Sequence, residues 1–345
     1  MAKEKTAELI KDIRVQDSNV IQWLLTQNNV NVRKNSNTIL MFAADRGHLN
    51  VVKWLVTEGN ANVEVSKNGT TALMLAAAKG HLNVVEWLVT EGNANVEVSK
   101  NGTTALMWAA DGGHLNVVEW LVTEGNANVE VSKNGDAPLM IATAKGHLDV
   151  VQWLVAEGNA NINVSKNGTT TLMVAADKGY LDVVQWLVAE GNANVEVGSK
   201  NGSTALIFAA TQGHLDIVEW LVKKSHANVE AANKHGLTSL MAASTQGHLD
   251  VVKWLVTEAH ANVLAANKNG LTPLIISSDA QTWEIYRFLK AQGAVTNPEI
   301  EKIIAKHNAR EVEIYAYLQD HGFAEPVAQL IGDYDSNNID SSIHV

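Results

Sequence analysis

The side chains with the clearest capacity for chemistry in this sequence are histidines that recur at intervals of 33 or 34 residues, interrupted once. Histidine nitrogens bind zinc, but zinc requires several ligands within about 2.0–2.1 Å of one point. If each interval is one structural unit packed on the next, successive histidines lie roughly 10 Å apart. The pattern therefore favours a structural role at helix junctions over a metal site. The histidines are His48, His81, His114, His147, His214 and His248.

Carboxylates offer a second kind of chemistry, since paired acids carry out general acid and base catalysis. Asp45, Asp111 and Asp177 occupy equivalent places in alternate units. That spacing holds them roughly 20 Å apart, which is too far for a catalytic pair. The sequence also lacks a phosphate-binding glycine loop, Gly-x-Ser-x-Gly and His-Glu-x-x-His. We therefore predict no enzymatic activity, no cofactor and no bound metal.

The composition limits the classes of partner and the cellular compartments that we expect for this protein. The 345 residues include no cysteine and carry a net charge of −11, which disfavours nucleic acid and anionic membrane as partners. The first residues alternate charges without an apolar core, so no signal peptide is expected. Apolar runs end far short of the roughly 20 residues that span a bilayer. These features predict a cytoplasmic protein without membrane insertion.

The elements that position these side chains belong to a repeat. Residues 100–132 copy residues 67–99 with three changes, and such a period is typical of a solenoid. The changes replace Leu75 by Trp108, Ala78 by Asp111 and Lys79 by Gly112. Their spacing of i, i+3 and i+4 places all three on one face of a helix.

Each unit reads as a turn followed by two helices. Lys-Asn-Gly at 67–69 is turn chemistry, and Thr71 is suited to cap a first helix that Gly80 ends. A second helix starts near Leu82, and we expect Gly92 to end it.

Eight such units occupy residues 34–297. Residues 1–33 and 298–331 are atypical, as expected of helical caps whose outer faces have no neighbouring repeat. Residues 332–345 are polar, and we expect them to be disordered. The units begin near Lys34, Lys67, Lys100, Lys133, Lys166, Lys200, Lys234 and Lys268.

These motifs resemble the ankyrin repeat family. The residues that carry the resemblance are Gly69, Thr71-Ala72-Leu73-Met74, Ala76-Ala77, Gly80-His81 and Val84-Val85-Glu86-Trp87-Leu88. The resemblance implies an all-α solenoid of helix-turn-helix units joined by β-turn or hairpin loops. It also implies a concave groove, lined by first helices and turn tips, that binds other proteins.

Four further series repeat along the chain. A methionine replaces the family's histidine after the leucine of the first helix, which predicts apolar packing between units. Tryptophans recur on the second helix, as a half-buried structural stripe or an exposed strip that contacts a partner. Lysines at the turn tips and glutamates before the glycine of the second helix form rows that keep the protein soluble or steer an acidic partner.

The three variable positions predict the binding residues. The second and third positions are expected in the groove, and Trp108 either packs there or anchors a partner. Gly112 and Gly113 beside it lack side chains, which would leave the indole face open. Asp136 lies in an altered turn next to this face. The predicted partner-binding residues are Phe42, Asp45, Arg46, Lys79, Trp108, Asp111, Asp136, Ile141, Lys145, Asp177, Lys178, Phe208 and Gln212.

The sequence therefore predicts a monomeric, non-enzymatic scaffold that binds another protein through repeats 3–5. Two alternatives stay open. The array could be a structural spacer or adaptor attached through its ends. It could also be a secreted bacterial effector that acts on host proteins in the host cytosol.

Overall fold

The computed structural model describes residues 33–34, 37–66, 69–98, 102–130, 137–163, 165–166, 168–279 and 282–295. The predicted caps at 1–33 and 298–331 and the tail at 332–345 therefore lie outside the described residues, except for Arg33. The chain divides into two compact units, Met1–Val195 and Glu196–Val345. The division falls in the loop of the fifth repeat, three residues before Gly198.

In the first unit, helices alternate with turns, and two turns contain short antiparallel hairpins. Arg33 pairs with Thr38 in one hairpin, and Ser165 pairs with Thr170 in the other. The elements are β1 (Arg33–Lys34), β2 (Asn37–Thr38), α3 (Ile39–Asp45), α4 (Leu49–Thr57), α5 (Ala72–Ala78), α6 (Leu82–Thr90), α7 (Ala105–Gly112), α8 (Leu115–Thr123), α9 (Pro138–Lys145), α10 (Leu148–Ala156), β3 (Ser165–Lys166), β4 (Thr169–Thr170), α11 (Thr171–Lys178) and α12 (Leu181–Ala189).

The second unit continues the same alternation in its described residues. Adjacent turns bond to each other, because the Lys234 amide donates to the Asn201 carbonyl over 2.7 Å and the Lys268 amide donates to the His235 carbonyl over 3.0 Å. The elements are α13 (Ala205–Gln212), α14 (Leu215–Ser225), α15 (Ser239–Gln246), α16 (Leu249–Thr257), α17 (Pro273–Asp279) and α18 (Trp283–Ala291).

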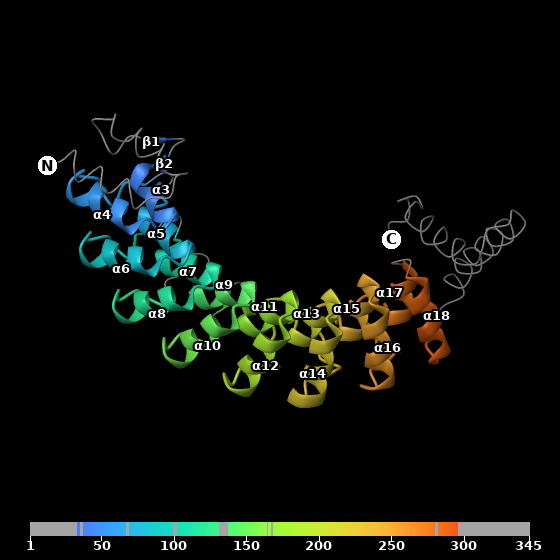
Figure 1. Ribbon diagram of the computed structural model, residues 1–345. Coiled ribbons are helices and arrows are strands. Elements are labelled where there is room, and N and C mark those ends of the chain that lie inside the picture. The colour runs from blue at the N-terminus through green and yellow to red at the C-terminus, as the bar shows by residue number, and fades with distance from the viewer. Residues whose placement is uncertain are drawn as a thin grey trace, which may run out of the picture. The chain divides into compact units, whose positions relative to one another are not determined.

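The helices of each unit form two rows. In the first unit, α3, α5, α7, α9 and α11 pack on one another in sequence, and α4, α6, α8, α10 and α12 form the second row (Figure 1). Each first helix also packs against the second helix of its own repeat. This arrangement confirms the predicted all-α solenoid of helix-turn-helix repeats.

Short first helices depend on caps and on packing. The Thr71 hydroxyl accepts the Met74 amide over 3.4 Å, and Ala76 and Ala77 are fully buried against neighbouring helices. Helices of seven or eight residues are marginal in isolation, so neighbouring repeats supply most of their stability. Gly113 ends α7 in the left-handed region, at φ 69°, as predicted for this glycine series.

The second helices end differently from the prediction. The C-cap residue of α6 is Glu91, and the left-handed residue is Asn93, at φ 54°, rather than Gly92. A β-carbon on Gly92 would lie 2.7 Å from the Leu88 carbonyl oxygen, so this glycine permits close backbone packing instead. His226 takes the same left-handed conformation at φ 55°, as does His260 at φ 56°. These histidines therefore replace a turn asparagine.

The core confirms that the methionine series packs inside. Six methionines are buried in the first helices, and Ile207 takes their place in α13. In the second helices, valine and leucine side chains such as Val84, Val85 and Leu88 are fully buried. Among the described residues, no helix combines the length and apolar character needed to cross a membrane. The buried methionines are Met41, Met74, Met107, Met140, Met173 and Met241.

Candidate protein-binding surface

The three variable positions lie on the solvent-accessible face of the first helices. In α7, Trp108 and Asp111 are half-buried and Gly112 is exposed. The same gradation holds along the first unit, where the third position is exposed in every repeat. We call this face of α3, α5, α7, α9 and α11 the first-helix surface. Its exposed third-position residues are Arg46, Lys79, Gly112, Lys145 and Lys178.

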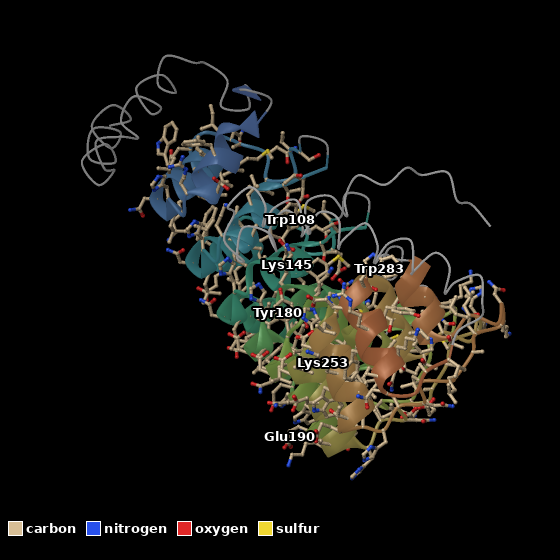
Figure 2. All side chains as sticks on the ribbon, turned by 90° about the vertical axis from the view of Figure 1, so that its right-hand side faces the viewer. Trp108, Lys145, Tyr180, Glu190, Lys253 and Trp283 are labelled. Atoms are coloured by element: carbon tan, nitrogen blue, oxygen red, sulfur yellow. The ribbon has the colours of Figure 1, made fainter. Side chains whose placement is uncertain are left out.

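An ion pair joins two of the predicted binding residues across neighbouring repeats. The Lys145 ammonium lies 3.2 Å from an Asp111 carboxylate oxygen, and both side chains are about half exposed. Figure 2 labels Trp108 and, below it, Lys145. An exposed pair of this kind contributes less than about 1 kcal/mol to stability. Its effect is to hold two opposite charges of neighbouring repeats together on the first-helix surface.

The other charged residues of the surface also occur as local pairs. Lys178 lies 3.2 Å from the Asp177 carboxylate, and Arg46 lies 3.9 Å from the Asp45 carboxylate. The Arg46 guanidinium carbon also lies 5.2 Å from the centre of the Phe42 ring. The three aspartates are thus matched by nearby cations, and the surface presents separated pairs of opposite charge rather than a carboxylate cluster.

The space beside the two glycines next to Trp108 is taken by histidine rings. A β-carbon on Gly112 would lie 2.6 Å from the His114 ring, and one on Gly113 would lie 2.6 Å from the His147 ring. Two imidazoles therefore take the space that the missing side chains leave. The indole is half-buried, so it can both pack and contact a partner.

Four of the recurring histidines connect their repeat to the one before it. The His147 Nε2 donates to the Asp111 carbonyl oxygen over 3.0 Å, because a carbonyl can only accept. His114 bonds the Ala78 carbonyl in the same way over 3.1 Å. These bonds confirm the predicted structural role. His81 and His248 repeat the contact, to Asp45 at 3.1 Å and to Thr211 at 3.0 Å.

This contact explains why the second variable position tolerates different residues. Its backbone carbonyl is held by the next repeat, whatever side chain it carries. The methionines replace a histidine of the family and so suggest that polar contacts between repeats are lost. The histidine of the Gly-His pair makes such a contact instead. Sequence reasoning missed it, although the constant Gly-His pair was the signal. In repeat 8, where threonine replaces this histidine, the Thr282 hydroxyl donates to the carbonyl of Ser244, one residue before the second variable position, over 3.2 Å.

Three other predicted residues lie on α9 and α13. Ile141 is half-buried on α9, next in the row to α7. Phe208 is half-buried and Gln212 exposed on α13, in the second unit. Asp136 lies outside the described residues. In the part of the chain that the structure describes, no three metal-ligating side chains converge on one point.

The tryptophan series is half-buried on the second helices of the first unit, from Trp54 to Trp186. In the second unit, Trp254 is only 8% exposed, and the Lys223 ammonium lies 5.2 Å from its ring centre. The tryptophan stripe is therefore partly structural, and a lysine ammonium lies over one of its rings.

Comparison with known families agrees with this architecture. A family model described as ankyrin repeats in three copies matches residues 10–99, 91–166, 126–197 and 159–233. A second, described as ankyrin repeats in many copies, matches residues 221–277. No curated protein matches the chain. The family matches extend over most of the sequence and over both described units, and the chain belongs to the ankyrin repeat family.

Proposed function

We propose that the chain is a non-enzymatic scaffold that binds another protein through the first-helix surface of repeats 3–5. Ankyrin repeats are general protein–protein interaction modules. The proposal rests on the separate roles of backbone and side chain at the second variable position. The Asp111 carbonyl is held by His147, while its side chain stays half exposed beside Lys145. Specificity can therefore vary without a change in the scaffold.

The chemistry of the surface indicates the form of contact. Trp108 offers a large aromatic area of the kind that dominates binding energy at protein interfaces. The pair formed by Lys145 and Asp111 and the pair formed by Lys178 and Asp177 add charges of both signs along the same surface. Such an arrangement favours a folded protein surface with complementary charges, which would orient the partner along α7, α9 and α11.

The sequence provides an unusually well-matched test. The triple variant Trp108→Leu, Asp111→Ala and Gly112→Lys makes residues 100–132 identical to residues 67–99. The altered repeat is then one that the chain already folds. We expect partner binding to weaken by about tenfold or more, since removing an aromatic hot spot costs about 2 kcal/mol. The partner is first identified by affinity capture and mass spectrometry, and its Kd is measured by calorimetry.

The control variant changes the same positions in another repeat. Thr245→Ala and Gln246→Lys alter the exposed second and third variable positions of repeat 7, outside the proposed surface, and should leave binding intact. Circular dichroism checks that both variants keep the helical content of the parent. Unchanged binding by the first variant would contradict the proposal. If deletion of residues 298–345 then abolished binding, attachment through the ends would explain the function instead.

A further inference from the structure

The second helices of the first unit carry charge of nearly one sign. We define the second-helix surface as α4, α6, α8, α10 and α12 with the residue that follows each. It contains nine carboxylates and one lysine, Lys53, and none of the nine is buried. Glu190 lies at the lower edge of the ribbon in Figure 2. The carboxylates are Glu58, Glu86, Glu91, Glu119, Glu124, Asp149, Glu157, Asp182 and Glu190.

Half-buried tryptophans run through this acidic surface, with one on each second helix. They are Trp54, Trp87, Trp120, Trp153 and Trp186. An aromatic ring attracts a cation to its face, and nearby carboxylates strengthen that attraction. The combination of repeated indoles and carboxylates therefore suits lysine and arginine side chains.

The second unit shows what occupies such a ring. The Lys223 ammonium lies 5.2 Å from the centre of the Trp254 ring of the next repeat, and it also contacts the Glu219 carboxylate over 3.1 Å. In the first unit, the positions equivalent to Lys223 are Thr57, Thr90, Thr123, Ala156 and Ala189, none of which is cationic. The carboxylate is retained in two repeats, as Glu86 and Glu119.

From this we infer that the second-helix surface of the first unit binds an extended, lysine- or arginine-rich segment of a partner protein. Each cation would sit on a tryptophan ring as Lys223 does on Trp254. Packed helices are about 8–10 Å apart, and an extended chain advances about 3.3 Å per residue. A cation at every third residue therefore matches one ring per repeat. This surface is separate from the first-helix surface proposed above.

The test uses the full chain and two synthetic peptides of about 15 residues, a length that spans the five rings. One peptide has lysine at every third position between serine and glycine. The other has the same composition with its lysines contiguous. We expect calorimetry to show tighter binding of the spaced peptide, with affinity falling as salt is added.

Ring occupation is tested by copying the second unit. The double variant Thr90→Lys and Thr123→Lys places a lysine four residues after Glu86 and Glu119, as Lys223 follows Glu219, so that it covers Trp120 and Trp153. Both threonines are exposed. We expect the spaced peptide to bind about tenfold more weakly, as two cation–aromatic contacts are lost.

A charge-matched control separates the rings from the net charge. The double variant Asn83→Lys and Asn116→Lys adds two lysines at exposed first-turn positions of α6 and α8. It should weaken binding by less than about threefold. Equal losses in both double variants would overturn the inference, as would no binding of the spaced peptide by the parent. Self-association of the parent that the ring-covering variant abolishes would assign the surface to a second copy instead.

Discussion

At the scale of single residues, the chain separates what holds the repeat from what varies. The Gly-His pair shows how. Gly113 takes a left-handed conformation that brings the His147 ring against it, and His147 then bonds the carbonyl of Asp111. Only backbone groups and the constant pair take part, so the Asp111 side chain is left to pair with Lys145.

This arrangement predicts that Gly113→Ala is unusually destabilising. The left-handed conformation costs an alanine about 1 kcal/mol, and the new β-carbon would displace His147 and its hydrogen bond at a further cost of about 1–2 kcal/mol. Urea unfolding followed by circular dichroism measures the loss.

Gly270→Ala is the matched comparison. Gly270 also has a positive φ, of 77°, but a β-carbon there would meet no atom within 4 Å. We expect it to cost only the conformational term, about 1 kcal/mol. Equal losses at Gly113 and Gly270 would show that the His147 contact contributes nothing to stability.

At the scale of the elements, first helices such as α5 and α7 are short and alanine-rich. They depend on neighbouring helices for stability. Thr143 in α9 departs from the buried alanine that α3, α5, α7, α11 and α13 have at this position. It is fully buried, and its hydroxyl has no hydrogen-bond partner. A buried hydroxyl without a partner costs stability, so this residue is a weak point in the row of first helices.

We therefore expect Thr143→Val to stabilise the protein by about 1 kcal/mol, since valine keeps the shape and removes the unpaired hydroxyl. Thr171, in α11, is equally buried, but its hydroxyl donates to the Ile162 carbonyl over 2.8 Å. Thr171→Val should destabilise by about 1 kcal/mol. Chemical denaturation measures the change in the free energy of unfolding for both variants. A loss of stability in Thr143→Val would refute the argument.

At the scale of the whole molecule, the chain divides into two compact units, and within each unit the first helices of neighbouring repeats pack on one another. Stability in such arrays is approximately a sum of local terms and interfaces between neighbours. Damage in one unit should therefore stay within it.

Leu255→Ala tests this expectation. Leu255 is fully buried in α16, and its truncation costs about 2–5 kcal/mol locally. Hydrogen exchange measured by mass spectrometry should become faster in α14, α16 and α18 and stay unchanged in α4, α6 and α8. Leu88→Ala, at a fully buried position in α6, should give the reverse pattern. Uniformly faster exchange in either variant would show that the two units unfold together.

The sequence by itself determined the repeat, the paired helices, the threonine caps, the buried methionines and the family. These features follow from local propensity and from a pattern that many copies reinforce. Local chemistry also predicted that Gly80 and its equivalents end the first helices. For the second helices it named Gly92, whereas the backbone turns at Asn93 because Gly92 must pack closely on Leu88.

Only the tertiary structure decided how the candidate surface is held. The bond from His147 to Asp111 joins residues 36 positions apart, and the ion pair from Lys145 to Asp111 joins neighbouring repeats. The Lys223 contact with Trp254 likewise crosses between repeats. Such contacts depend on the register in which one repeat stacks on the next. That register arises from the packing of whole helices, and no short stretch of sequence encodes it.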